Sequence, residues 1–320
     1  MDELLVACPI DSGKDFRVVY TVPQGGRTFS IVACKKCGLQ MINPQPTPEV
    51  LSSYYDERYY GKGTKKFIPI ITWLRRLSVK KKVRKISSFY AHRTGKVIDI
   101  GCADGAFLFN IMKRKWDVYG SEHSESFATS PYLHDIKVHI GDIDTLGADN
   151  CSFDVVTLWH VFEHLADPNR YLREINRIIK PNGLLVLTLP NIDSWQAKLF
   201  KAKWFHLDPP RHLFHFSPAT LRVLLKKNNF TVERIEHFSL EYNPYGFIQS
   251  LYNLTFGGYN HLYEFLKNTD TRILRQYPLQ IVTQMLLLVI LVPVSIVFAI
   301  FEAGAKKGGT IKVYIRKKNQ

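Results

Sequence analysis

The stretch VIDIGCADGAFL, residues 97–108, constrains the fold more than any other part of the chain. An apolar, β-branched run ends around Asp99 and enters a turn with two glycines, after which helix-forming residues follow. This order predicts a strand, a tight turn and a helix. Glycine lets the backbone approach a ligand closely, and a carboxylate at the end of a strand can bind an ammonium or hydroxyl group. We therefore expect a polar small molecule to bind at this turn.

The spacing of the glycines argues against a dinucleotide. Dinucleotide-binding turns carry G-x-G-x-x-G, whereas Gly101 and Gly105 are four residues apart and follow an acid. The form D-x-G-C-x-x-G resembles motif I of the class I S-adenosylmethionine-dependent methyltransferases, where the methionine part of the cofactor lies against the loop. Ala103 stands where that motif often has a middle glycine. An ordinary strand-to-helix turn is the alternative.

Two further acids extend this resemblance. Glu122 lies 21 residues beyond Gly101, where doubly wound folds present an acid to ribose hydroxyls. The resemblance implies that Asp142 meets the adenine amino group and that Ile143 packs on the ring, with a turn cap as the alternative for Asp142. The expected cofactor residues are Asp99, Gly101, Cys102, Ala103, Gly105, Glu122, His123, Asp142, Ile143 and Trp159.

The segments after the fourth and fifth predicted strands also resemble motifs of this family. The implied fold is an α/β, doubly wound, Rossmann-like methyltransferase sheet whose last strand is antiparallel. It carries a small N-terminal zinc-ribbon-like module and a hydrophobic C-terminal insertion. The expected divisions are a ribbon module (1–45), a basic helical linker (46–95), the cofactor-binding core (96–237), the insertion (238–309) and a last strand with a basic tail (310–320).

The N-terminal module contains two cysteine turns. Cys34 and Cys37 form a C-x-x-C knuckle, which brings two thiolates to one metal ion. The first turn supplies Cys8, with Asp11 where a second cysteine is expected. We expect one structural zinc ion on these four residues, and a ribbon without metal is the alternative. The arrangement resembles the N-terminal ribbon of a subset of these methyltransferases.

The chain is basic, with a formal charge of +15, which favours an anionic partner. Twelve lysines or arginines and no acid lie in residues 62–96, interleaved with apolar residues at helical spacing. One interpretation is a helix that packs on the core with a solvated basic face. The other is a basic amphipathic segment on anionic lipid. Nucleic acid is the less favoured partner. Five cysteines without a signal peptide suggest a reducing, cytoplasmic compartment.

The connection 190–216 is long and aromatic. Loops beyond the carboxyl ends of strands hold the ligands of open α/β sheets, so we expect it to act as an acceptor lid. His160, at the end of the fourth strand, and His212, on this connection, are the candidate catalytic bases. A pocket wall or a hydrogen-bond donor is the alternative role for each.

Residues 281–301 carry no charge and are long enough to span a bilayer. A helix buried in the core is the alternative. A complete crossing would leave the last strand on the wrong side of the membrane. We therefore expect a re-entrant or in-plane anchor, bent near Pro293, on the cytoplasmic face of a membrane.

These observations predict an S-adenosylmethionine-dependent methyltransferase that acts on a small-molecule or lipid-linked acceptor at a membrane surface. O-methylation of a saccharide, quinone or lipid intermediate is the favoured reaction. An RNA methyltransferase and a non-catalytic, membrane-bound binding module are the alternatives. The acceptor and the oligomeric state have no signature in the sequence.

Overall fold

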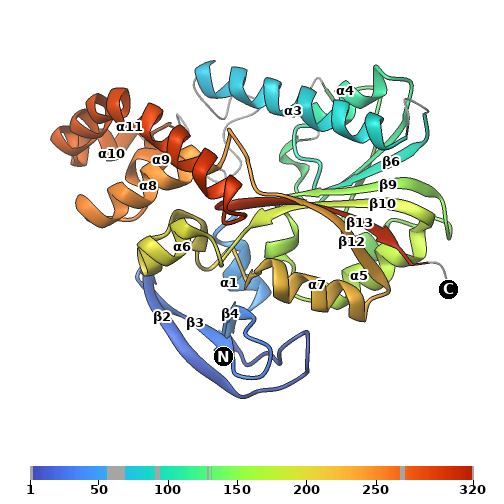
Figure 1. Cartoon of the computed structure of the whole chain (residues 1–320), viewed down its shortest axis with the longest axis horizontal. Helices are drawn as coiled ribbons and strands as arrows, with labels where there is room; N and C mark the ends of the chain where they lie inside the picture. Colours follow the sequence, from blue (N-terminus) through green and yellow to red (C-terminus); the bar gives the residue numbers. More distant parts are fainter. Residues whose placement is uncertain are drawn as a thin grey trace.

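A seven-stranded mixed sheet forms the centre of the molecule (Figure 1). The computed structural model describes residues 3–55, 69–90, 94–127, 130, 132–266 and 271–318. Along the sheet the strand order is β12-β13-β10-β9-β6-β7-β8. The strands are β6 (Lys96–Ile100), β7 (Asp117–Glu122), β8 (Lys137–Ile140), β9 (Phe153–Trp159), β10 (Ile179–Pro190), β12 (Phe230–Glu236) and β13 (Thr310–Lys317).

Strand direction confirms the expected fold class. Neighbouring strands from β10 to β8 run parallel, and β13 runs antiparallel to both β10 and β12. Residues 184–189 of β10 are all buried, as expected for a strand covered on both faces. The sheet is therefore the doubly wound methyltransferase sheet with a reversed last strand.

Helices cover both faces of the sheet (Figure 1). α3 (Pro69–Phe89) and α4 (Ala106–Met112) lie on one face, and α5 (Pro168–Ile178) and α7 (Pro218–Lys227) lie on the other. α7 begins with a capping box between Ser217 and Thr220, as the Ser-Pro sequence predicts. The 3₁₀ turns are Glu125–Phe127, Ile143–Thr145, Phe162–His164, Lys201–Lys203 and Phe205–Leu207.

The basic segment forms a helix that packs on the core. Val83 and Ile86 of α3 are 4% and 1% exposed and join the cluster around α4 and β6. The apolar stripe of this helix therefore faces protein, which favours the interpretation of a core-packing helix with a basic outer face. Residues 62–68 and 91–93 of the segment lie outside the described residues.

The N-terminal module shares a sheet with the connection after β10. A four-stranded sheet has the order β11-β4-β3-β2, and β11 (Phe214–His215) belongs to that connection. The other elements are β1 (Glu3–Leu4), β2 (Phe16–Gln24), β3 (Arg27–Cys34), β4 (Gln40–Ile42), β5 (Gln45–Pro46) and α1 (Pro48–Ser52). The module therefore docks directly on the segment expected to cover the acceptor.

That connection is not an open lid, which corrects the expectation. It contains α6 (Trp195–Phe200) and two 3₁₀ turns, and Trp204, Leu207 and Phe216 are fully buried. Its aromatic residues pack because they fill the space between the central sheet and the N-terminal module. The aromatic composition of the segment thus reflects a core.

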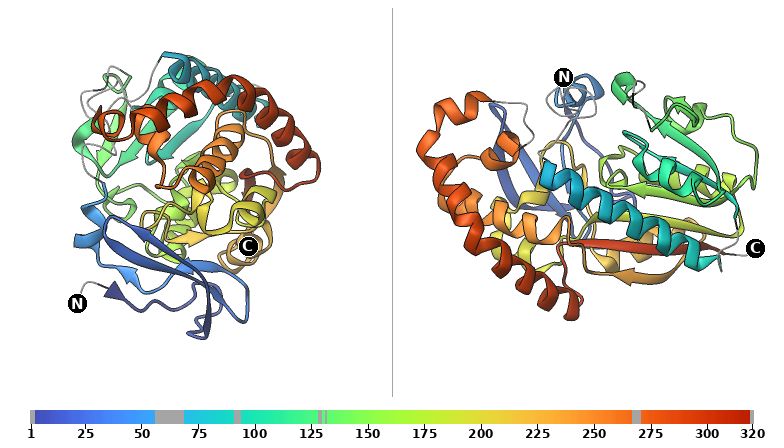
Figure 2. Two further views of the ribbon diagram at one scale, coloured as in Figure 1. Left: turned by 90° about the vertical axis from the view of Figure 1, so that its left-hand side faces the viewer. Right: turned by 90° about the horizontal axis from the view of Figure 1, so that it is seen from above.

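In the described residues between β12 and β13 there are four helices, gathered at one end of the molecule (Figure 2). They are α8 (Asn243–Thr255), α9 (His261–Leu266), α10 (Thr271–Gln276) and α11 (Pro278–Gly304). α11 is long and apolar enough to cross a membrane, and 17% of its most apolar 18-residue stretch is buried. It continues through Pro293 as one helix, so the expected re-entrant bend is wrong. An in-plane anchor agrees with this geometry.

Candidate functional site

The turn after β6 has the conformation that its glycines allow. Gly101 and Gly105 have φ of +71° and +75°. A Cβ at Gly105 would come within 2.1 Å of the Leu133 side chain, so glycine is required here for packing as well as for conformation. Ala103 also has a positive φ, +48°. Its position is the one where the family often has glycine, and the backbone keeps that conformation with alanine.

Glu122, at the end of β7, is held against this turn. Its Oε2 accepts a hydrogen bond from Ala103 N at 2.8 Å. Its Oε1 accepts from the backbone N–H groups of His123 at 2.8 Å and Ser124 at 3.2 Å. The carboxylate is thus fixed next to the glycine turn, where the sequence predicts a ribose ligand. His123 itself is exposed and contributes this backbone donor.

Asp99 is buried behind the turn. It is 2% exposed, and its Oδ1 accepts a hydrogen bond from Thr157 Oγ1 at 2.5 Å. Burial raises the pKa of Asp99 to about 8, although Thr157 and the nearby Lys82 favour the charged form. A cationic ligand at this point would therefore bind a carboxyl group that the protein alone holds largely protonated.

Asp142 and Ile143 were expected to contact the adenine of the cofactor, but their side chains are engaged within the protein. The Asp142 carboxylate caps the turn after β8 by accepting from Ile143 N at 2.7 Å, and it also binds the side chains of Arg170 and Tyr171. Ile143 is 1% exposed and packs in the core. In this structure Asp142 is thus the turn cap, the alternative role, and the Ile143 side chain has no free face for a ring.

Cys102 and Trp159 lie on either side of the glycine turn. Cys102 is 5% exposed, and its Sγ would lie 2.8 Å from a Cβ at Gly120, so the thiol fills the gap beside β7. Burial raises the pKa of Cys102 well above its usual range, so it stays neutral. Trp159 packs edge-to-face on Phe107 and carries Lys82 Nζ 4.4 Å above its ring. Lys82 thereby reaches the strand ends from α3.

His160 follows β9 with a positive φ of +57°. Its Nδ1 lies 3.1 Å from Glu163 Oε1, and its ring is 4.1 Å from that of Tyr242. Within the part of the chain that the structure describes, Nε2 of His160 is buried without a hydrogen-bond partner. Burial lowers the pKa of His160 to about 3, so the ring is neutral at neutral pH. With Nδ1–H donating to Glu163, the lone pair of the neutral ring is on Nε2.

The other candidate base, His212, lies on the far side of Glu163. Its Nδ1 is 2.8 Å from the carbonyl oxygen of His206, and its ring meets that of His164 at 4.6 Å. Both candidate bases therefore lie close to Glu163. The sequence analysis assigned no function to Glu163. The pattern HVFEH, residues 160–164, nevertheless places three ionisable residues close together.

The sequence analysis also did not name three residues near the site: Lys82, Thr157 and Tyr242. Lys82 was indistinguishable from eleven other cations of its segment, and Thr157 sits inside an apolar strand. Tyr242 comes from the insertion, about 80 residues beyond His160, and only the return of β13 to the sheet brings the two together. No local pattern signals such a long-range contact.

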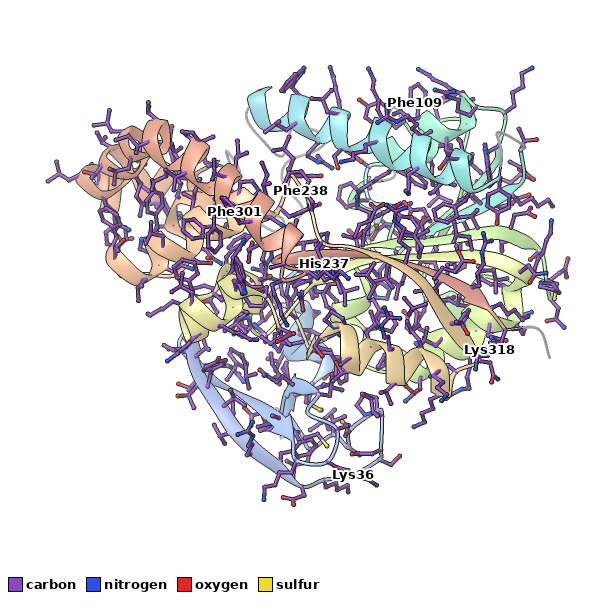
Figure 3. All side chains as sticks on the ribbon, viewed as in Figure 1. Lys36, Phe109, His237, Phe238, Phe301 and Lys318 are labelled. Carbon is purple, nitrogen blue, oxygen red and sulfur yellow. The ribbon has the colours of Figure 1, made fainter. Side chains whose placement is uncertain are left out.

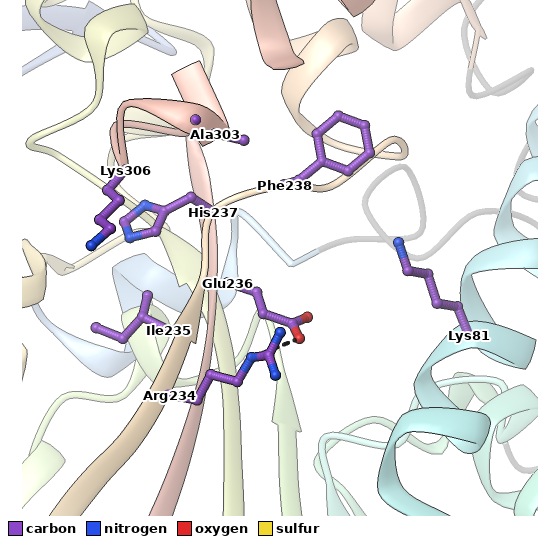
Figure 4. Close-up of a pocket in the computed structure, with 9 residues that line it drawn as sticks. Lys81, Arg234, Ile235, Glu236, His237, Phe238, Ala303 and Lys306 are labelled. Carbon is purple, nitrogen blue, oxygen red and sulfur yellow. Dashed lines mark ion pairs between the residues drawn. The ribbon is translucent and has the colours of Figure 1, made fainter. Parts of the chain in front are cut away.

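A pocket opens at the end of β12, between α3 and the end of α11 (Figure 4). β12 runs parallel to β10, so this pocket lies at the same edge of the sheet as the glycine turn. Its volume is about 420 Å³. It is lined by Lys81, Arg234, Ile235, Glu236, His237, Phe238, Ala303, Gly304 and Lys306. Three cations and one acid give it a positive character, with Arg234 and Glu236 paired at 3.3 Å.

The four ribbon residues come together in the N-terminal module. Lys36, which lies between Cys34 and Cys37 in the sequence, is labelled in Figure 3. Cys8 Sγ lies 3.4 Å from Cys37 Sγ, and Cys34 Sγ lies 3.2 Å from Asp11 Oδ2. One ligand atom from each residue lies within 4.8 Å of all the others. A tetrahedral zinc ion with zinc–sulfur distances of about 2.3 Å separates its sulfurs by roughly 3.8 Å, so the cluster fits zinc.

The sheet order, the glycine turn and the acid after β7 can now be set beside known proteins. The family model described as "Methyltransferase domain" matches residues 71–235, slightly more than half of the chain. The chain belongs to this methyltransferase family. Its core is that of an S-adenosylmethionine-dependent methyltransferase, as the turn after β6 predicts. The ribbon module lies outside the matched residues.

Relatives within the family are distant. The chain is 26% identical to a ubiquinone biosynthesis O-methyltransferase of Maricaulis maris over 162 residues, which is 47% of this chain and 63% of that protein. It is 28% identical to one of Coxiella burnetii over 128 residues, 38% and 52% of the two chains. The matches therefore span less than two thirds of these relatives.

The chain also resembles solved structures at low sequence identity. A crystal structure of a SAM-dependent methyltransferase from Archaeoglobus fulgidus covers 76% of this chain and 94% of its own, with 23% identity and a TM-score of 0.46. This likeness concerns the fold alone.

Proposed function

We propose that this methyltransferase transfers a methyl group from S-adenosylmethionine to an oxygen of a small or lipid-linked acceptor at a membrane surface. The observation that carries this proposal is the position of His160. A ring nitrogen with no hydrogen-bond partner among the described residues lies at the carboxyl edge of the sheet, after the strand next to the turn that follows β6. The O-methyltransferases of ubiquinone biosynthesis among its relatives support a small acceptor.

The donor is proposed to lie along the turn after β6. Glu122 would accept the ribose hydroxyls, and the second oxygen of Asp99 would bind the ammonium group of the methionine part. Gly101, Ala103 and Gly105 would bring the backbone against the cofactor, with Trp159 beside it. We assign no adenine contact to the side chains of Asp142 and Ile143, because one is engaged by Arg170 and Tyr171 and the other is in the core.

The methyl transfer is an in-line displacement. The acceptor oxygen attacks the methyl carbon as the carbon–sulfur bond breaks, and the electron pair of that bond goes to sulfur. The acceptor proton moves to Nε2 of His160. The low pKa of His160 keeps this nitrogen unprotonated before reaction, and Glu163 Oε1 beside Nδ1 orients the ring. Holding donor and acceptor in contact supplies most of the acceleration.

The acceptor is proposed to extend into the pocket at the end of β12. Its volume of about 420 Å³ suits a small ligand. Lys81, Arg234 and Lys306 favour an anionic group on that ligand, and Phe238 offers an apolar surface. A phosphate- or carboxylate-bearing acceptor with an apolar part, such as a lipid-linked intermediate, matches this lining.

The membrane contact is proposed to be α11, lying in the plane of the surface. Tyr252 Oη donates to the carbonyl oxygen of Gln284 at 2.7 Å, and the Glu302 carboxylate accepts from Gln196 Nε2 at 2.7 Å. These two attachments are 18 residues apart, roughly 27 Å of helix, so α11 is tied to the protein along most of its length. Its opposite face is apolar and exposed, including Val289 at 79%.

The ribbon module is proposed to hold one structural zinc ion on Cys8, Asp11, Cys34 and Cys37. Burial raises the pKa of the Cys8 and Cys37 thiols, so the protein alone does not favour thiolates, whereas a zinc ion would bind them deprotonated. The zinc would stabilise the module that pairs with β11. We place the protein at the cytoplasmic face of the membrane.

The test is methyl transfer from labelled S-adenosylmethionine to a membrane-lipid extract and to a soluble extract of the source cells. Label in a lipid-soluble or small polar product supports the proposal. Label in RNA, with steep salt dependence, would favour the RNA methyltransferase alternative. Cofactor binding without label in any fraction would favour a binding module and contradict the proposed reaction.

A further inference from the structure

A second group of ionisable side chains lies directly behind His160. Glu163 and His164 belong to the 3₁₀ turn after β9, and His212 comes from the connection before β11. Each offers one ligand atom, and the three atoms lie within 4.8 Å of one another. Glu163 is 1% exposed and His212 is 8% exposed. The cluster therefore joins two segments almost 50 residues apart inside the protein.

Backbone carbonyls lie at Nδ1 of both imidazoles. His164 Nδ1 lies 2.9 Å from the carbonyl oxygen of Arg211 and at the same distance from the Tyr55 hydroxyl, and His212 Nδ1 lies 2.8 Å from the carbonyl oxygen of His206. A carbonyl oxygen only accepts hydrogen bonds, so Nδ1 of His212 carries the proton, and Nδ1 of His164 carries it in the tautomer that donates to Arg211. These tautomers leave a lone pair on each Nε2. Metal-binding histidines are oriented in this way, with the second ring nitrogen donating to a carbonyl.

The Glu163 carboxylate supplies the third acceptor. Its Oε1 lies 3.1 Å from His160 Nδ1. Its Oε2 is buried and, among the residues that the structure describes, has no hydrogen-bond partner. A buried carboxylate oxygen without a donor is costly unless a cation binds it. The nearby Arg211 guanidinium is paired with Asp208 at 2.6 and 3.0 Å.

We propose that Glu163, His164 and His212 bind a divalent transition-metal ion such as Mn²⁺, Fe²⁺, Co²⁺ or Zn²⁺. Two imidazoles and one carboxylate suit these ions better than Mg²⁺ or Ca²⁺, which prefer oxygen ligands. Asp208 Oδ2 lies 3.9 Å from His212 Nε2, so a second carboxylate borders the site. Three protein ligands leave coordination positions for water or a hydroxyl group.

The position of the site connects it to His160. Glu163 Oε1 lies beside His160 Nδ1, and the same carboxylate belongs to the cluster with His164 and His212, so a bound cation would act on the candidate base through a shared carboxylate. Any effect of the metal on turnover rests on the proposed function. Binding of the metal does not, and it can be measured without a methyl acceptor.

The test is to titrate the full chain with Mn²⁺. Binding is measured as the loss of the electron paramagnetic resonance signal of free Mn²⁺. We expect one bound equivalent, with affinity lowered more than about tenfold in Glu163→Gln and in His212→Gln. Cys34→Ser should leave this binding unchanged, because Mn²⁺ avoids thiolate sites. His215→Gln, which removes a buried imidazole from β11 outside the cluster, is the matched control.

Cobalt provides a second measurement that leaves the cluster intact. In the Cys34→Ser chain, bound Co²⁺ should give ligand-field absorption without sulfur-to-cobalt charge transfer. Retained Mn²⁺ affinity in Glu163→Gln, or Co²⁺ bound only through cysteines, would overturn the metal site. Metal binding without methyl transfer would leave the site standing and contradict only the proposed reaction.

Discussion

Nδ1 of His160 lies 3.1 Å from Glu163 Oε1, while Nε2 of the same ring is buried without a partner in the described part of the chain. This relationship gives the first prediction. His160→Gln removes the proposed proton acceptor, so kcat should fall about 10²–10⁴-fold, with cofactor affinity in calorimetry nearly unchanged. His215→Gln, a buried histidine of β11, should keep kcat. Equal activity of the two variants would exclude His160 as the base.

The pH dependence of the rate provides a further check on His160. Because burial lowers its pKa to about 3, the ring is already neutral throughout pH 5–8. The rate should therefore show no step near pH 6.5, where an ordinary histidine loses its proton. A step near 6.5 that disappears in His160→Gln would contradict the low pKa.

Asp99 gives a prediction in which stability and binding change in opposite directions. Burial raises its folded-state pKa to about 8 from 3.8. The folded protein thus favours the protonated form of Asp99. The contribution of this protonated side chain to the free energy of unfolding is complete below pH 3.8 and is lost as pH rises toward 8. Asp99→Asn should therefore increase the free energy of unfolding at pH 8 relative to wild type, by a few kcal/mol at most, and change it little at pH 4.

The same substitution should also weaken binding of the cofactor. Wild-type affinity for S-adenosylmethionine should rise between pH 6 and 8, because the ammonium group binds the ionised carboxylate, and Asp99→Asn should be weaker and independent of pH. Chemical denaturation and calorimetry at several pH values measure both effects. Asp149→Asn, at an exposed loop residue, is the control. Unchanged stability with unchanged affinity would show that Asp99 is not the buried ligand.

The sequence was sufficient for the core because its signals there are local. Gly101 and Gly105 follow β6 and Glu122 ends β7, and their spacing alone places them on one edge of the sheet. The fold class and the reversed last strand were predicted from the family resemblance that these residues carry. In these cases the residues that carry the pattern also make the contacts.

Prediction from the sequence was wrong where long-range contacts decide how a side chain packs. Ile143 was expected on the adenine ring, but the core takes its side chain, and Arg170 and Tyr171 reach Asp142 from the next helix. The aromatic connection was expected to be a lid, yet it pairs through β11 with a module from the other end of the chain. Only the assembled fold determines such contacts, so no local pattern predicts them.

Glu122 should contribute directly to cofactor affinity. Glu122→Ala removes the proposed acceptor of the ribose hydroxyls and also the carboxylate that holds Ala103 N–H. Hydrogen bonds to a charged group contribute about 1.5–3 kcal/mol, so affinity should fall about 10- to 150-fold. Glu122→Gln keeps the shape of the side chain and should lose less. Calorimetry measures both variants, and wild-type affinity in Glu122→Ala would remove this residue from the site.

The ribbon gives a prediction by metal analysis. Protein purified without chelator should carry about one zinc ion per chain, and Cys34→Ser should lose it and lower the melting temperature. Cys151→Ser is the matched control, because Cys151 is exposed and outside the cluster. Zinc that survives in Cys34→Ser but disappears in Glu163→Gln would assign the metal to the other site. A chain without zinc would support the metal-free ribbon.

The apolar face of α11 gives the last prediction. Leu286, Val289 and Ile290 are 69%, 79% and 64% exposed, whereas Leu288 and Leu291 pack against α8 and α9. Aspartate at the three exposed positions should release the protein from anionic vesicles, because insertion of each charge is opposed by up to roughly 2.5–3.5 kcal/mol.

The same change should leave the fold intact, because these side chains have little protein contact. Val223→Asp, at a half-exposed position of α7, is the control and should stay bound. Wild type should sediment with vesicles even in high salt, since salt screens the cations of α3 but not the apolar contact. Release of wild type by salt alone, or full binding of the triple variant, would contradict an in-plane anchor on this face.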